Sequence, residues 1–86
     1  MIDDKLTLEI REILIRDWDP IGIGHNPNLQ DEYDGYINEI SNLLLNNTGV
    51  DDIENYLRHI EIDEISTEVD IITRHKVACK LKKIIN

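Results

Sequence analysis

Apolar residues recur every three to four positions in four stretches of this 86-residue chain. That spacing puts them on one face of an α-helix, and no stretch shows the sustained alternation typical of a strand. The pattern therefore predicts an all-α fold, a small bundle of about four helices in a single domain over residues 1–86. The helical stripes consist of Leu6, Ile10, Ile13 and Leu14; Tyr33, Tyr36, Ile37, Ile40, Leu43 and Leu44; Ile53, Tyr56, Leu57 and Ile60; and Val69, Ile72, Ala78, Leu81 and Ile85.

Residues 17–27 interrupt this pattern, because they hold the only tryptophan, both prolines and two of the four glycines. Proline cannot continue a helix and glycine opens otherwise forbidden backbone angles, so a structured Trp-Asp-Pro loop is expected after the first helix. Trp18 either fills the core, with its indole nitrogen bonded to a backbone carbonyl, or stands on the surface as a contact residue. Gly35 is expected to let this loop approach the second helix closely.

Helix boundaries follow from charged and hydroxyl residues. The first helix is predicted over about residues 4–16 and the second from about 28–31 to 46, with Asp31, Glu32 and Asp34 in its first turn, where negative charge suits the helix dipole. Thr48 and Asp51, like Thr67 and Asp70, have the spacing of a capping box. These pairs predict the starts of a third helix, ending near residue 62, and of a fourth.

The net charge of −9 is unevenly distributed. All 18 acidic residues lie between Asp3 and Asp70, whereas residues 71–86 hold five basic residues and no acid. Such a field disfavours direct binding to nucleic acid and favours a basic protein partner. Two ordinary interpretations stay open: the acids keep the protein soluble, and the basic residues offset the dipole of the last helix.

Candidate chemistry is sparse. Asp17 to Gly22 resembles part of a calcium loop, but Ile21 and Asn28 stand where ligands are needed, and Gly22-Ile23-Gly24 lacks the preceding strand of a phosphate loop. His25, His59 and His75 are interpreted as lone polar residues, and Cys79 as a buried neutral thiol. We therefore expect no catalytic activity, no metal and no cofactor.

The N-terminus and the single cysteine bear on the cellular location. The chain opens with acids where a secretory signal has basic residues, and no apolar run approaches the length of a membrane span. One cysteine forms no internal disulfide. A cytoplasmic protein without membrane association is expected.

Two motifs carry a resemblance to a known family. The segment Trp18 to Gly22, followed by Asp31-Glu32-Tyr33-Asp34 and the helix from Ile37 to Leu44, resembles the YugE-like family of small bacterial domains. The resemblance covers roughly residues 8–82 and implies an all-helical fold without an assigned activity. Small acidic families of this kind also resemble immunity proteins encoded beside bacterial toxins.

Together these observations predict an acidic, non-catalytic binding protein: an immunity protein or inhibitor that occludes the active site of a basic, nuclease-type toxin. The alternative is a structural or adaptor module that self-associates or docks a partner through apolar surface. The pattern leaves the oligomeric state open. The predicted partner-binding residues are the acids Asp17, Asp19, Asp31, Glu32, Asp34, Asp51, Asp52 and Glu54.

Overall fold

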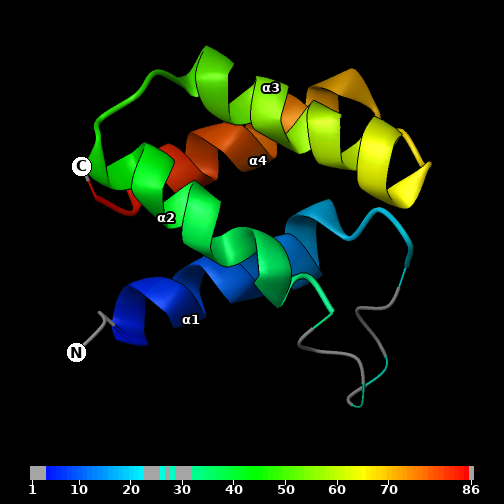
Figure 1. The fold of residues 1–86 in the computed structure, drawn as a ribbon, viewed down its shortest axis with the longest axis horizontal. Coiled ribbons are helices and arrows are strands. Elements are labelled where there is room, and N and C mark those ends of the chain that lie inside the picture. The colour runs from blue at the N-terminus through cyan, green and yellow to red at the C-terminus, as the bar shows by residue number, and fades with distance from the viewer. Residues whose placement is uncertain (1–3, 23–25, 27, 29–31, 86) are drawn as a thin grey trace.

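The computed structural model describes residues 4–22, 26, 28 and 32–85, and within these ranges it is all-helical and has no strand. Its four α-helices are α1 (Asp4–Ile13), α2 (Ile37–Leu45), α3 (Val50–His59) and α4 (Ile71–Lys83). Successive helices run in opposite directions, with α3 beside α4 and α1 beside α2 (Figure 1). The predicted small α-helical bundle is confirmed.

Two helices continue as π-helical segments that the sequence pattern did not predict. Leu14–Trp18 (η1) extends α1, and Ile60–Ile65 (η4) extends α3. Each ends at a residue with positive φ, Asp19 at 33° and Ser66 at 62°. Such π turns change which side chains face inward, and they are frequent at functional sites.

The core takes most of its side chains from the predicted stripes. Trp18 is 3% exposed and belongs to this core, so of its two possible placements the structure shows the core one. Two apolar residues on these helices lie outside the core: Leu8 is 56% exposed, and Ile72, from the fourth predicted stripe, is 61% exposed. The buried apolar residues are Leu6, Ile10, Leu14, Ile15, Trp18, Tyr33, Ile37, Ile40, Leu44, Ile53, Leu57, Ile60, Val77, Ala78 and Leu81.

Both predicted capping boxes are wrong. Gly49 precedes α3 without a side-chain cap, and the Thr48 hydroxyl donates to the carbonyl of Leu43 instead. The fourth helix starts later than expected, at Ile71, where the Asp70 carboxylate accepts from the amide of Thr73 at 3.0 Å. Asp70 is thus the cap itself rather than the third residue of a box.

The second helix also begins later than predicted. A short 3₁₀ turn, η3 (Asp34–Tyr36), leads into α2 at Ile37. Gly35 lies in that turn, and among the described residues no atom lies within 4 Å of a Cβ built on it. Contrary to the prediction, the described part of the Trp-Asp-Pro loop therefore makes no close approach at Gly35.

Among the described residues, no helix has the length and apolar character that crossing a membrane requires.

Candidate functional site

A buried ion pair joins the ends of three helices. Glu61, on the π turn after α3, is fully buried, and Arg74, on α4, is 5% exposed. The Arg74 guanidinium donates to the Glu61 carboxylate through Nη2 at 2.8 Å and through Nε at 3.2 Å. The Trp18 indole donates to the same carboxylate at 2.7 Å. The indole partner is thus a carboxylate and not the expected backbone carbonyl.

Among the described residues, no buried side-chain nitrogen or oxygen lacks a hydrogen-bond partner. The Val69 amide donates to Glu61 at 3.0 Å, and Arg74 Nη2 donates to the Val69 carbonyl at 2.9 Å. Hydrogen bonding to Glu61 is the main cause that raises the pKa of Arg74, against an opposing effect of burial. Because a buried charge is tolerated only when paired and hydrogen-bonded, these contacts explain how both ions lie in the core.

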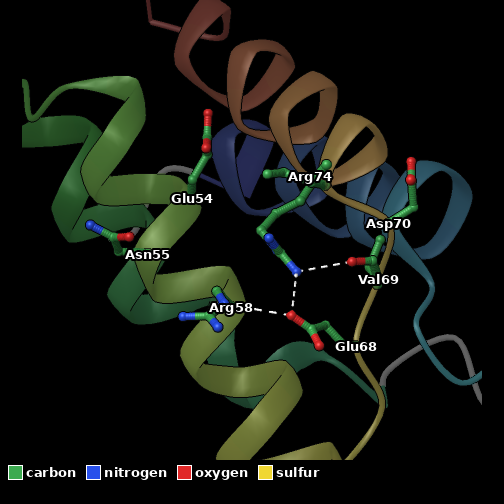
Figure 2. A pocket seen from close by; sticks show the side chains of 8 residues that line it. Glu54, Asn55, Arg58, Glu68, Val69, Asp70 and Arg74 are labelled. Carbon is green, nitrogen blue, oxygen red and sulfur yellow. Dashed lines mark hydrogen bonds and ion pairs between the residues drawn. The ribbon is translucent and has the colours of Figure 1, made fainter.

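A groove of about 590 Å³ opens above this cluster, between α3 and the segment leading into α4 (Figure 2). Arg58 lies on the α3 wall, and Glu68 faces it from the opposite segment. Glu68 Oε2 is 3.6 Å from Arg58 Nε and also 3.6 Å from Arg74 Nη2. The lining residues are Glu54, Asn55, Arg58, Glu68, Val69, Asp70, Ile71 and Arg74.

One carboxylate of this groove belongs to a second contact chain. Glu54 contacts Nδ1 of His75, and Nε2 of the same ring lies 3.5 Å from the Cys79 sulfur. His59, likewise, pairs with Asp63 at 2.6 Å. The interpretation of these two histidines as lone polar residues is therefore wrong, and Cys79 is half-buried rather than buried. His25 lies outside the described residues.

A second surface combines acids with tyrosines. Tyr36 and Tyr56 are half-buried. Burial raises the pKa of the Tyr36 phenol, and the charges of Glu64 and Glu32 raise it further. Burial is also the main cause that raises the pKa of Tyr56, and the electrostatic effects of Glu39, Tyr36 and Glu64 raise it further. Glu32, Tyr36 and Glu64 line one groove, and Glu39 and Tyr56 interact electrostatically with its residues. We call these five residues the acid–tyrosine face: Glu32, Tyr36, Glu39, Tyr56 and Glu64.

The acid–tyrosine face is hollowed at one end. A groove of about 330 Å³ lies there, lined by Ile21, Glu32, Tyr33, Tyr36, Glu64 and Ile65. The Tyr36 ring packs edge-on against Trp18, with centroids 6.4 Å apart and planes at 86°. Tyr33 packs on Trp18 from 5.4 Å. Because Trp18 is itself held by Glu61, the aromatic wall of the groove is fixed to the core.

Four of the predicted partner-binding acids are engaged within the protein. Asp17 pairs with Lys80 at 3.2 Å, and Asp19 accepts from the Tyr33 hydroxyl at 2.8 Å. Asp34 accepts two hydrogen bonds from Arg11, at 2.9 and 2.6 Å, which fasten the turn before α2 to α1. Glu54 contacts His75, as described above.

The remaining predicted acids differ in position. Glu32 lies on the acid–tyrosine face, and Asp51 and Asp52 are exposed in the first turn of α3. Asp52 stands one helical turn before Tyr56, so it shares that side of α3. Asp31 lies outside the described residues.

Four residues of this face were not among the predicted partner-binding residues: Glu39, Glu64, Tyr36 and Tyr56. Tyr36 and Tyr56 fall on apolar stripes, so the pattern assigned them to the core. One available signal was the phenol itself, since a tyrosine on a stripe often keeps its hydroxyl end at the surface.

Comparison with known proteins gives no match to a family model, to a curated protein or to a solved structure. The resemblance to the YugE-like family stays a prediction.

Proposed function

We propose that this is a non-catalytic acidic binding protein that neutralises a basic protein, a bacterial nuclease toxin being the partner class that fits best. The protein would act in the cytoplasm and bind neither nucleic acid nor membrane directly. A net charge of −9 supports this proposal, since it steers a basic partner toward the protein and speeds association.

The acid–tyrosine face is the observation that carries the proposal. Tyrosine is enriched among the residues that dominate binding energy, because it offers a large rigid contact and a polar tip. Here Tyr36 and Tyr56 supply such anchors, and Glu32, Glu39 and Glu64 supply the charge. A nuclease active site binds phosphates through basic residues, and the carboxylates of this face would pair with the same basic residues.

The proposed contact surface therefore differs in part from the sequence prediction. We assign binding to Glu32, Asp51 and Asp52 from the predicted set, together with the rest of the acid–tyrosine face. Asp17, Asp19, Asp34 and Glu54 would act indirectly, since their intramolecular contacts hold neighbouring segments in place.

The test begins with capture of partners on the immobilised protein from lysate and secretome at low salt, followed by elution with increasing salt and mass identification. The retained basic protein is then assayed for nuclease activity with and without one equivalent of this protein. Loss of nuclease activity supports the proposal. Retention of no basic protein, or unchanged nuclease activity in the complex, would overturn it.

A second candidate is the adaptor module that docks through apolar surface. Ile71 and Ile72, adjacent at the start of α4, are 69% and 61% exposed, which favours an apolar contact there. Salt separates the two functions, because charge-steered binding weakens with ionic strength whereas an apolar contact hardly responds. Self-association that persists at high salt and is lost in Ile71→Ser/Ile72→Ser would favour this candidate.

A further inference from the structure

We propose that the groove at the end of the acid–tyrosine face is a receptor for a single lysine side chain of the basic partner. This inference rests on the proposed function and names the chemical group that the face recognises. The described residues that line the groove are Ile21, Glu32, Tyr33, Tyr36, Glu64 and Ile65, and none of these is basic.

The lining provides both parts of a site for an ammonium on an aliphatic stem. Ile21, 45% exposed, and the half-buried Ile65 offer apolar walls against which methylenes pack. Glu32 and Glu64 come from two different parts of the chain, and both line the groove together with Tyr36. An ammonium placed between them gains two ion pairs and a contact with the face of an aromatic ring.

The size and rigidity of the groove fit one side chain. Ligand pockets span about 300–1,000 Å³, and a groove of about 330 Å³ stands at the lower limit. The Tyr33 hydroxyl is already used, since it donates to Asp19 at 2.8 Å and accepts from the Ile21 amide at 3.3 Å. These bonds hold the Ile21 wall in place, so little ordering is required on binding.

The geometry favours lysine over arginine. Arginine is recognised best by one carboxylate that accepts two parallel hydrogen bonds, as Asp34 does from Arg11 in this protein. In the groove the two carboxylates belong to separate segments. An ammonium, whose three N–H groups diverge, can donate to both and to the Tyr36 hydroxyl.

Binding of trilysine peptide, followed by two-dimensional NMR of the isotope-labelled protein, tests this inference without the partner. We expect shifts centred on Glu32, Tyr36 and Glu64, and a trilysine affinity above that of triarginine. The double variant Glu32→Gln/Glu64→Gln should bind trilysine about tenfold more weakly than the parent. The control Glu9→Gln/Glu12→Gln removes the same charge from α1, outside the groove, and should change the affinity little. Trinorleucine, which keeps the stem without the ammonium, should cause no shifts.

Three outcomes would overturn the inference: shifts spread over all acidic surfaces, equal losses in the two double variants, or equal affinity for trilysine and triarginine. The two proposals fail separately. A nuclease inhibited by a protein whose groove ignores trilysine would remove the lysine site alone. Specific trilysine binding without any retained basic protein would remove the proposed function and leave the lysine site.

Discussion

Arg74 Nη2 lies 2.8 Å from Glu61 Oε1, and the two side chains are only 6% and 0% exposed. This pair lies where α4, the π turn after α3 and the end of the first helical segment meet. Trp18 is the third side chain of the cluster, and its indole N–H donates to Glu61. The core of the protein is therefore held by a hydrogen-bonded ion pair as well as by apolar contacts.

Removing one partner of the Glu61–Arg74 pair should lower the free energy of unfolding far more than removing an exposed charge. Glu61→Ala removes the buried counter-charge of Arg74 and the acceptor of both Arg74 Nε and the Trp18 indole, so the free energy of unfolding should fall by about 3–5 kcal/mol. Urea unfolding followed by circular dichroism measures this loss. The control Glu64→Gln, three residues away and exposed, should stay within about 0.5 kcal/mol of the parent. Equal stability of Glu61→Ala and the control would contradict the structure.

Removing both ions together should cost less than removing one. In Glu61→Leu/Arg74→Met, neither charge remains buried, and apolar side chains of similar length fill the space. The double variant should be more stable than Glu61→Ala, because the uncompensated charge is gone. Urea midpoints of the parent, Glu61→Leu, Arg74→Met and the double variant form a complete cycle. A strictly additive cycle would show that the two residues do not interact.

The start of α4 depends on Asp70 rather than on Thr67. Asp70→Ala removes the bond to the Thr73 amide and should cost about 1 kcal/mol. Thr67→Ala should have a smaller effect, since Thr67 contributes its backbone amide to the carbonyl of Glu61 and keeps it after substitution. Thermal unfolding of both variants compares the two positions. A larger loss of stability in Thr67→Ala than in Asp70→Ala would support the predicted capping box and contradict the Asp70 cap.

Tyrosine ionisation should destabilise the protein at high pH. Burial is the main cause that raises the pKa of the Tyr33 phenol, and the hydrogen bond to Asp19 adds to it. A raised folded-state pKa contributes stability that is fully present below the unfolded-state pKa of about 10 and is lost as pH rises through the folded-state pKa. The free energy of unfolding should therefore decline above about pH 10.

Absorbance at 295 nm follows phenol ionisation directly. All three tyrosines should ionise above the pH of free tyrosine in the native protein and return to it in urea. Tyr33→Phe keeps the buried ring but has no hydroxyl to ionise, so its stability should decline less at high pH than that of the parent. Native tyrosines that ionise like free tyrosine would contradict the burial of these side chains.

The helical stripes predicted the fold because burial at Ile10, Leu14, Ile53 and Leu57 follows a regular period of three to four residues. The same reasoning failed at Glu61. Its neighbours Ile60 and Ile62 mark it as the polar residue between two apolar ones, yet Glu61 is buried and Ile62 is 45% exposed. The π-helical turn shifts the inward position, and a pattern built on the α-helical period does not contain that shift.

Arg74 illustrates a second limit. It stands three and four residues before Val77 and Ala78, on the buried side of α4. A charged residue on an apolar stripe is normally assigned to the surface, because its burial depends on a partner distant in sequence. The acid–tyrosine face escaped prediction for a related reason: the segment leading into α2 meets α3 and η4 there, and no local spacing relates Tyr36 to Tyr56 or Glu64.

Paired capture on two baits tests the central claim that the acid–tyrosine face binds a basic partner. Glu39→Lys/Glu64→Lys reverses two charges of the face, and Glu9→Lys/Glu12→Lys changes the net charge equally on α1. The basic protein retained by the parent should be lost on the first bait and kept on the second. Equal retention, or equal loss, on the two baits would show that this face does not select the partner.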